Sequence, residues 1–433
     1  MSTVGHASLM QGWLPLAVYS ASVVALICAL GWRSRLRNLR WLPAIVVFAV
    51  LATALVRWYF GTLGSASEPA PWQLWLWVAL SIIGVGSVLA GWSRASWSRR
   101  NLAAFATSLC LLSTGLAVNA WIGYVPTVAT GWNQLTGAPL PGQTDWGGVA
   151  AAQRRTIVPR DGMLLPVRID APTSRFAHRE ELVYLPPAWF RSTPPPALPA
   201  VLMIGGAFNT PADWVRAGDA VHTLNAFAAA HGGNAPVVVF ADSNGSFGND
   251  TECVNGPRGN AADHLTKDVV PYLIATFGVR AEPSAWGVAG FSAGGTCAVT
   301  LAVKYPEIFS AFVDIAGDET PNAGTKANTI ERLYGGNAEA WSQFDPVTVM
   351  ARHGAYTATS GLFVVPQSGE EPDGYQTAAR TLCDMGFGHG IDCSIVQFTG
   401  RHVWPFAARS FAETLPWLAS RVGVPGAPAA SIT

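Results

Sequence analysis

Five consecutive residues, Gly290-Phe291-Ser292-Ala293-Gly294, combine a serine hydroxyl with the small neighbours that a very tight turn requires. They follow an apolar run at 285–289 and precede a helix-like run that ends near Pro306. In a nucleophile elbow, a sharp turn between a strand and a helix holds a serine oxygen exposed above the edge of a sheet. The pentapeptide alone is a weak signal, so its interpretation depends on the residues that would act with Ser292.

A serine hydroxyl becomes a good nucleophile only when a base removes its proton and a third group orients that base. In proteins with a serine elbow of this type, the acid comes after the serine in the sequence and the histidine comes after the acid. His402 comes after the strand-like run 391–398 and precedes a helix, so we expect it at the same sheet edge. Two other histidines follow Ser292, but His353 ends a helical stretch and His389 lies in a glycine loop. We therefore predict that His402 is the base.

The orienting acid should follow the apolar run 361–365, and an acidic segment at 368–373 does so. It offers Glu371, which is the first choice, and then Asp373 and Glu370. Two acids after the preceding strand, Asp318 and Glu319, would serve only if the acid had moved to another strand. Any one of these acids is more often solvated than catalytic.

An ester carbonyl under attack develops negative charge, and each backbone N–H aimed at it contributes roughly 3 to 4 kcal/mol to lowering the barrier. We predict the N–H of Ala293 as one donor. The second should come from the loop after the run 200–204, where we choose Gly206; the alternative is that Gly205 and Gly206 only close a turn. A long polar loop at 245–259 should face the same edge and contact a hydroxylated substrate, although solvation alone would also explain its polarity.

These residues require a sheet that brings strand ends together. Near-continuous apolar runs are typical of strands buried on both faces of a parallel sheet, and they occur at 200–204, 236–241, 285–289, 309–315, 361–365 and 391–398. Helix-like segments alternate with them, at 211–230, 261–277, 293–305, 374–385 and 405–422. Right-handed crossovers then predict a mostly parallel sheet with helices on both faces and the site at the carboxyl ends. Segments 156–169 and 179–185 would add an antiparallel edge.

The front of the chain is apolar. Half of the 433 residues are apolar and only 12% are charged, which is unusual for a soluble enzyme. Four segments, at about 13–32, 41–59, 72–92 and 102–124, are long enough to cross about 30 Å of hydrocarbon, and tryptophans mark most of their ends. We predict four transmembrane helices in residues 1–124, a linker at 125–150, a catalytic domain at 151–424 and a tail at 425–433.

Arginines predict the orientation of these helices. The first and third connecting loops carry Arg33, Arg35, Arg37 and Arg40, and Arg94, Arg99 and Arg100, whereas the N-terminal tail and the second loop carry no Lys or Arg. By the positive-inside rule, the arginine loops are cytoplasmic and everything after residue 124 is extracytoplasmic. No basic stripe with interleaved aromatics indicates nucleic-acid binding. The expected partners are therefore the lipid bilayer and an acyl ester or lipid substrate.

Cysteine usage agrees with this orientation. Two of the six cysteines, Cys28 and Cys110, lie in the apolar segments and should be unpaired. An oxidising compartment permits disulfides among the other four, and we pair Cys383 with Cys393 and Cys253 with Cys297. Metal ligation is the alternative, but neither a C-x-x-C pair nor spaced histidines support it. We predict no metal and no cofactor.

The predicted catalytic domain resembles the esterase D family of α/β hydrolases, which includes the mycobacterial mycolyltransferases of the antigen 85 complex. The likeness covers roughly residues 154–422 and rests on Val183-Tyr184-Leu185-Pro186-Pro187, the elbow through Gly295, and Gly400-Arg401-His402-Val403-Trp404. It implies an α/β hydrolase fold in which Ser292 is the nucleophile, His402 the base, and Ala293 and the residue after Gly205 the oxyanion donors. The mycolyltransferases carry Asp-Gly-Leu-Arg where this chain has Ile204-Gly205-Gly206-Ala207, a departure that puts trehalose mycolate in doubt as the substrate. A four-helix front joined to such a domain is similar to actinobacterial cell-envelope esterases.

These observations predict a membrane-anchored, extracytoplasmic serine esterase that needs no cofactor. Ser292 would attack the ester carbonyl, His402 would transfer the proton, Glu371 would orient His402, and water would release the acyl group. One alternative is acyl transfer to a sugar or glycolipid of the cell envelope. The other is a non-catalytic binding module of the same fold, which would lack a member of the triad.

Overall fold

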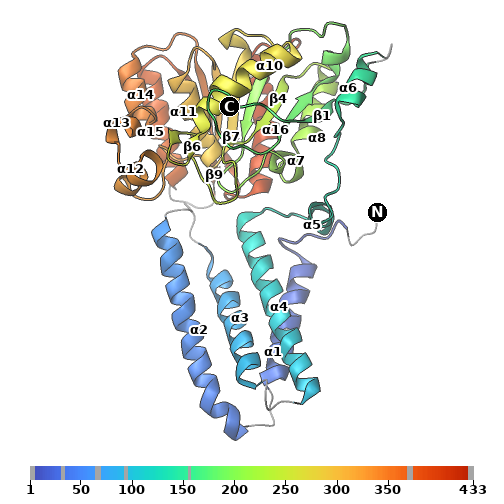
Figure 1. Cartoon of the computed structure of the whole chain (residues 1–433), viewed down its shortest axis with the longest axis vertical. Helices are drawn as coiled ribbons and strands as arrows, with labels where there is room; N and C mark the ends of the chain where they lie inside the picture. The colour runs from blue at the N-terminus through green and yellow to red at the C-terminus, as the bar shows by residue number, and fades with distance from the viewer. Residues whose placement is uncertain are drawn as a thin grey trace. The chain divides into compact units, whose positions relative to one another are not determined.

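The computed structural model describes residues 5–30, 35–63, 70–91, 96–154, 158–367 and 374–427. The chain divides into two compact units, Met1–Ala138 and Pro139–Thr433. The first is helical and the second is an α/β unit (Figure 1). The division between the units falls within the segment 125–150 that was predicted as a linker.

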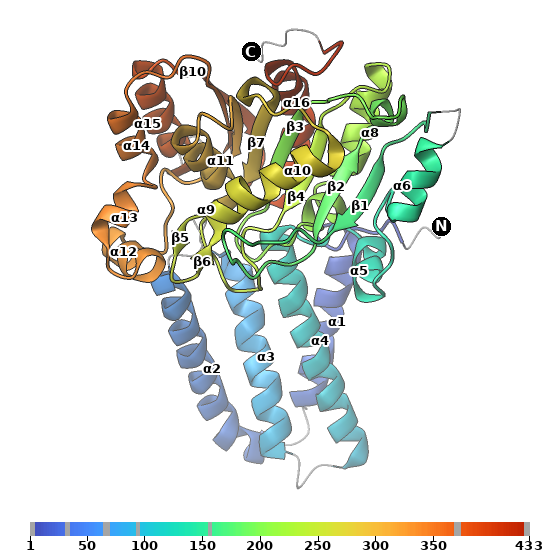
Figure 2. The ribbon, with the colours of Figure 1, turned by 45° about the horizontal axis from the view of Figure 1, so that its top comes forward.

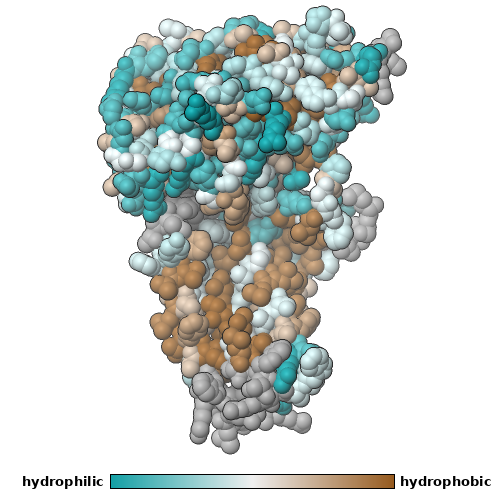
Figure 3. Space-filling view, viewed as in Figure 1, coloured by the Kyte–Doolittle hydropathy of each residue, from teal (hydrophilic) through white to brown (hydrophobic). Residues whose placement is uncertain are grey.

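Four long helices dominate the first unit: α1 (Trp13–Leu30), α2 (Arg35–Leu63), α3 (Trp72–Gly91) and α4 (Trp97–Ile122). All four are long and apolar enough to cross a membrane. Small polar side chains join them, as Ser22 Oγ lies 2.8 Å from Ser113 Oγ and Ser81 Oγ lies 3.0 Å from Thr114 Oγ1. Many of their large apolar side chains point outward and make the surface of this unit hydrophobic (Figure 3). Such a surface is typical of helices that contact lipid.

The segment 125–150, which we expected to be a linker, contains helical structure. Helix α5 (Val128–Leu135) lies in the first unit, and α6 (Trp146–Gln153) begins the second. Both helices have N-cap side chains that satisfy free amides of the first turn, since Thr127 accepts from the Thr130 N–H and Asp145 from the Gly148 N–H. In the sequence, the boundary between the two units falls between these helices.

An eight-stranded sheet forms the centre of the second unit, in the order β1-β2-β4-β3-β7-β8-β9-β10. Strands β3, β4 and β7 to β10 are parallel, whereas β1 and β2 form an antiparallel edge. The strands are β1 (Met163–Val167), β2 (Glu181–Leu185), β3 (Ala200–Ile204), β4 (Val237–Ala241), β7 (Trp286–Phe291), β8 (Ala311–Ile315), β9 (Ser360–Gln367) and β10 (Asp392–Thr399). Strands β5 (Asn255–Gly256) and β6 (Gly259–Asn260) make a separate small hairpin. The predicted mostly parallel sheet with an antiparallel edge is confirmed.

Helices cover both faces of this sheet. Helices α8 (Ala220–Ala230) and α16 (Trp404–Arg421) pack together on one face, and α10 (Val270–Phe277) and α11 (Ala293–Lys304) cover the other (Figure 2). The remaining elements are η1 (Pro187–Phe190), α7 (Asp213–Arg216), α9 (Ala261–Asp263), η2 (His264–Val269), η3 (Pro283–Ala285), α12 (Lys326–Tyr334), α13 (Ala338–Ser342), α14 (Pro346–His353) and α15 (Gly374–Gly388). Two predicted helices are interrupted: Asp219, with φ 49°, separates α7 from α8, and η2 is a π-helical turn between α9 and α10.

Both predicted disulfides are present. Cys253 pairs with Cys297 and Cys383 with Cys393, with Cα atoms 5.6 Å apart in each pair. Cys28 and Cys110 are free, as expected for cysteines in the apolar helices. The first disulfide links the long loop after β4 to α11, the helix that follows the serine elbow.

Candidate active site

Ser292 occupies a strained turn between β7 and α11. Its φ of 60° and ψ of −127° lie in a region that residues with a side chain rarely adopt. The Ser292 N–H donates to Ile315 O at 2.9 Å, and the Ser292 carbonyl accepts from the N–H groups of Gly295 and Thr296 at 2.7 and 3.1 Å. These bonds hold the turn, so the predicted nucleophile elbow is formed.

The two glycines of the pentapeptide are required by packing. A Cβ atom added at Gly290 would lie 2.0 Å from Gly294 O, and one added at Gly294 would lie 2.3 Å from Ile204 O. A larger residue at Gly290 would therefore push the end of β7 away from the start of α11, and one at Gly294 would push α11 away from the end of β3. The close approach brings the loop after β3 against the serine.

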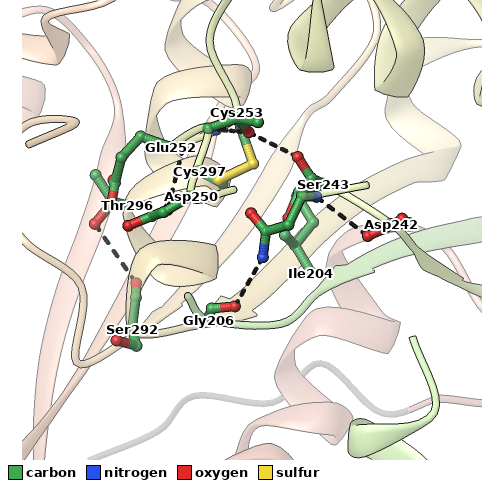
Figure 4. The surroundings of a disulfide bond; sticks show 12 residues. Ile204, Gly206, Asp242, Ser243, Asp250, Glu252, Cys253, Ser292, Thr296 and Cys297 are labelled. Atoms are coloured by element: carbon green, nitrogen blue, oxygen red, sulfur yellow. Dashed lines mark hydrogen bonds between the residues drawn. A yellow bond between two sulfur atoms is a disulfide. The ribbon is translucent and has the colours of Figure 1, made fainter. Parts of the chain in front are cut away.

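Gly206 lies directly against Ser292, where an oxyanion donor is expected. A Cβ atom added at Gly206 would be 3.0 Å from Ser292 Cβ, and Figure 4 shows the two residues near each other. The Gly206 carbonyl accepts hydrogen bonds from Asn244 Nδ2 and the Asn209 N–H, each at 3.2 Å, which fixes this peptide. Within the described residues, neither the Gly206 nor the Ala293 N–H donates a hydrogen bond. Both amides are thus available, and Ala293 also begins α11, where the helix dipole is positive.

His402 packs against the elbow from the loop that follows β10. Its ring centroid lies 4.6 Å from that of Phe291, the residue before the nucleophile. Trp404, at the start of α16, also contacts Phe291, at 5.5 Å. Burial lowers the pKa of His402 from 6.5 to about 4, so the imidazole is neutral near pH 7 and can accept a proton. The structure therefore brings together the predicted nucleophile and the predicted base.

The other histidines after Ser292 have different surroundings. His353, at the end of α14, stacks on Tyr356 at 4.1 Å. His389 Nδ1 lies 3.0 Å from Gly354 O. Both therefore pack around the loop between α14 and β9, which leaves His402 as the histidine at the elbow.

The predicted acids Glu370, Glu371 and Asp373 lie outside the described residues. The alternatives Asp318 and Glu319 are described. Asp318 Oδ2 accepts from Asn322 Nδ2 at 2.5 Å, and its backbone N–H donates to Thr296 Oγ1 at 2.8 Å. Glu319 is exposed. Asp318 and Asp250, which are half-buried, lie near the buried Glu252, where burial and repulsion by the two neighbouring acids raise the pKa of Glu252.

Side chains of the polar loop at 245–259 mainly hold the loop itself. Asn249 Nδ2 donates to the carbonyls of Asn244 and Arg258, at 2.8 and 3.0 Å. Arg258 donates to the carbonyl of Asp250. The disulfide of Cys253 adds a covalent link to α11 (Figure 4). These groups account for much of the loop's polarity without a substrate.

Arg179 is a site residue that the sequence analysis missed. Its Nε and Nη2 atoms donate to the carboxylate of Asp242 at 3.0 and 2.5 Å, and Nη2 also donates to Asn209 O at 2.7 Å. Burial alone would raise the pKa of Asp242, but the paired guanidinium outweighs it and holds that pKa below 3.8. Arg179 thereby ties the segment before β2 to the loops after β3 and β4, including the loop that carries Gly206.

Phe208 and Phe247 were also missed. Their rings are 5.4 Å apart, and they are 43% and 81% exposed, respectively. Phe208 follows Gly206 closely and has a φ of 65°, a strained value for a bulky residue. Phe247 comes from the loop after β4. The only signal in the sequence was an aromatic residue within each of two polar or glycine-rich loops.

Comparison with known proteins supports the chemistry of this site. Residues 178–383 match the family model described as "Putative esterase". An uncharacterized protein of Corynebacterium glutamicum is 28% identical over 421 residues, covering 95% of each chain and therefore both units. Among solved structures, an S-formylglutathione hydrolase from Agrobacterium tumefaciens is similar at 19% identity and a TM-score of 0.48, over 62% of this chain and 98% of its own. MPT51 of Mycobacterium tuberculosis is similar at 19% identity and a TM-score of 0.41, over 60% and 97%.

The family match contains the elbow, both predicted oxyanion donors and the Arg179–Asp242 pair. His402 lies beyond the matched residues, yet it packs against the elbow. The α/β unit of this chain, which is similar to the esterase family model over residues 178–383, is therefore a serine hydrolase or acyltransferase with the α/β hydrolase fold.

Proposed function

We propose that this protein is a membrane-anchored, extracytoplasmic serine esterase. The observation that carries the proposal is the strained Ser292 turn, with the neutral ring of His402 packed against the residue before it. Ester hydrolysis requires a nucleophile, a base and an oxyanion site, and this edge of the sheet supplies a candidate for each.

The reaction begins when Ser292 Oγ attacks the carbonyl carbon of an ester and its proton passes to His402. The negative oxygen of the tetrahedral intermediate receives hydrogen bonds from the N–H groups of Ala293 and Gly206. His402 then protonates the leaving alcohol as the C–O bond breaks, which leaves an acyl-serine. Water, deprotonated by His402, attacks this ester and releases the carboxylic acid.

The acid that orients His402 is proposed to come from the segment 368–373, with Glu371 as the first choice. Described residues on both sides of that segment support this. Gln367 O accepts a hydrogen bond from the Gly400 N–H at 3.3 Å. Tyr375 stacks on His402, with ring centroids 5.0 Å apart and planes within 6°. The chain therefore leaves β9 beside the histidine loop and is again beside the histidine at the start of α15.

Phe208 and Phe247 suggest an acyl group as the part of the substrate that this site binds. Two exposed aromatic rings in contact form an apolar patch beside the oxyanion loop. Binding an apolar group there would remove apolar surface from water, which contributes a favourable free energy of about 25 cal/mol for each Å² buried. This favours esters of apolar acids over small polar esters.

The location is supported by the helices and by the disulfides. Four helices are able to cross a membrane, and two disulfides are typical of an oxidising compartment. Reporter fusions test the topology: alkaline phosphatase fused after residue 154 should be active, and fused after residue 35 inactive. Activity in the reverse pattern would contradict the extracytoplasmic location.

Hydrolysis of p-nitrophenyl esters of increasing acyl length tests the proposed activity. We expect kcat/KM to rise with chain length in the wild type, and Phe208→Ala and Phe247→Ala to reduce this rise. Phe387→Ala is the matched control, since Phe387 is 78% exposed on α15. If acylated sugars accumulate when sugars or envelope glycolipids are added, the acyltransferase alternative replaces hydrolysis. Equal turnover of short and long esters would contradict the acyl-binding role of the two rings.

A further inference from the structure

Three buried side chains outside the active site converge on one carboxylate oxygen. Glu181 Oε1, at the start of β2, lies 2.9 Å from His178 Nδ1 and 2.9 Å from His264 Nε2. The ligand-type atoms of these three residues all lie within 4.8 Å of one another. Glu181 and His264 are fully buried, and the side chain of His178 is only 9% exposed. Two imidazoles and a carboxylate are a common ligand set of Zn²⁺ in proteins.

The second oxygen of this carboxylate is an independent observation that points to a ligand. Among the described residues, Glu181 Oε2 has no hydrogen-bond partner although it is buried. A buried carboxylate oxygen without a hydrogen-bond partner has lost its hydration and gained no replacement interaction, which destabilises the folded protein by several kcal/mol. A divalent cation held by both oxygens of Glu181 would remove that cost.

Asp268 lies on the far side of the His264 ring. Its Oδ2 atom is 3.6 Å from His264 Nδ1, the nitrogen that faces away from Glu181. Asp268 is itself held by the backbone N–H groups of Thr173 and Ser174. At this distance the two groups are in contact without a hydrogen bond, and His264 Nδ1 has no hydrogen-bond partner among the described residues. A closer approach of Asp268 in a metal-bound state would let His264 Nδ1 donate to it, which would keep the proton on that nitrogen and direct the lone pair of Nε2 toward the metal.

The backbone at His264 is also unusual. Residues His264–Val269 form a π-helical turn, a rare conformation that occurs frequently at functional sites. The rings of His178 and His264 are stacked, with centroids 4.3 Å apart, so that both nitrogens reach the same point. The fold thus brings His264 to the carboxylate of Glu181, which is 83 positions away in the sequence.

We infer that His178, Glu181 and His264 bind a divalent transition-metal ion, most suitably Zn²⁺, with Asp268 orienting His264. Typical Zn–N and Zn–O bonds of about 2.0 to 2.2 Å separate tetrahedral ligands by about 3.3 Å, so the contacts would open by only a few tenths of an ångström. Glu181 would bind through both oxygens, which lie closer together than about 3.3 Å, so the four-coordinate ion would have a distorted tetrahedral geometry.

The ion would have a structural role that reaches the active site. Arg179 lies between two of its ligands in the sequence and binds both Asp242 and the carbonyl of Asn209. Asn209 in turn packs against the oxyanion loop, since a Cβ atom added at Gly205 would lie 2.8 Å from Asn209 Cβ. A metal that fixes His178 and Glu181 would therefore hold Arg179 and the position of Gly206.

The competing state is a metal-free hydrogen-bonded cluster. In that state His178 Nδ1 lies 2.9 Å from Glu181 Oε1 and 2.8 Å from the Arg179 carbonyl. The hydrogen bond that the protonated ring donates to Glu181 raises the pKa of His178 to about 9. A bound metal would replace this proton, as metal ions do when they bind protonated ligands. Direct measurement of bound metal separates the two states.

The test uses the full chain, purified in detergent, stripped with a chelator and then titrated with Zn²⁺ by calorimetry. Bound metal is counted by elemental analysis, and Co²⁺ in place of Zn²⁺ should give the visible absorption of a tetrahedral site. We expect one ion per wild-type chain, loss of that ion in His264→Ala and Glu181→Gln, and roughly 10- to 100-fold weaker binding in Asp268→Asn.

His222→Ala is the matched control because His222 is an exposed histidine, and it should keep the ion. No stoichiometric binding by folded wild-type protein would overturn the inference. So would wild-type affinity in a folded His264→Ala variant. If the buried variants do not fold, the wild-type titration and His178→Ala decide the question. These measurements detect metal and not ester turnover, so their failure is distinct from failure of the proposed esterase activity.

Discussion

Gly206 and Ser292 lie so close together that a Cβ atom at Gly206 would stand 3.0 Å from that of the serine. It would also lie 3.2 Å from Phe291 O. The oxyanion loop and the elbow are thus closely packed, and a methyl group at this position would require one of them to move by a few tenths of an ångström. This contact leads to the first prediction.

Replacing Gly206 with Ala should push the oxyanion amide away from the reacting carbonyl. We expect kcat to fall by roughly 10²- to 10³-fold, the typical effect of losing one donor, with little change in KM. Gly388→Ala is the control, because a Cβ atom at Gly388 meets nothing within 4 Å. Steady-state kinetics on a soluble ester measure kcat and KM for the wild type and for both variants. A Gly206→Ala variant with wild-type kcat would contradict the assignment of this donor.

The pH profile should report the burial of His402. Burial lowers its pKa to about 4, so the neutral, proton-accepting form persists below pH 6.5. We therefore expect kcat/KM to stay constant down to pH 6.5 and to fall only as the pH approaches the lowered pKa. Initial rates across an acidic pH series give the apparent value. An acidic limb at or above 6.5 would show that the ring is not desolvated in the working enzyme.

The acid partner can be identified by three isosteric variants. Glu371→Gln should lower kcat by about 10⁴-fold, as removal of the orienting carboxylate does in other serine hydrolases. It should also shift the acidic limb further down, because a nearby carboxylate stabilises the charged imidazole. Glu370→Gln and Asp373→Asn are the matched controls, and each should leave both readouts near wild type. If one of them produces the double effect instead, that residue is the partner.

Asp314 should make the protein less stable as pH rises. Its carboxyl is buried in β8, and burial raises its pKa from 3.8 to about 8, although a bond from the Gly317 N–H opposes the shift. Between these two values the unfolded chain has released the proton and the folded chain still holds it. Stability should therefore fall with rising pH, by at most about 1.4 kcal/mol per pH unit.

Asp314→Asn should remove this dependence, since the amide oxygen can still accept from the Gly317 N–H and carries no charge. Thermal unfolding of both proteins in detergent from pH 4 to pH 8 measures the difference. We expect the melting temperature of the wild type to decline more steeply than that of the variant. Parallel curves would show that Asp314 ionises normally.

Local patterns in the sequence were sufficient to predict most of the fold. The buried strands are continuous apolar runs, and β3 has the predicted bounds, Ala200–Ile204. The interruptions in predicted helices come from single backbone features, such as the positive φ of Asp219. Propensity and periodicity do not specify such local conformations, because tertiary contacts select them.

The site was predictable where a motif fixes local geometry and not where distant residues converge. Ser292, Ala293 and Gly206 follow directly from a strand end and its turn. Arg179 acts on Asp242, which is 63 positions away, and His264 contacts Glu181 across 83 positions. The local sequence around Arg179 or His264 does not predict its partner, because only the tertiary fold brings each residue to that partner.

The central claim is that Ser292 is an activated nucleophile, and labelling with a fluorophosphonate probe tests it most directly. The probe forms a covalent bond with a serine only when a base and an oxyanion site activate that serine. Exposed Ser246, in the neighbouring loop, provides the control variant Ser246→Ala. The account predicts labelling of the wild type and of Ser246→Ala, and no labelling of Ser292→Ala. Failure of the folded wild type to react, or continued labelling of Ser292→Ala, would contradict it.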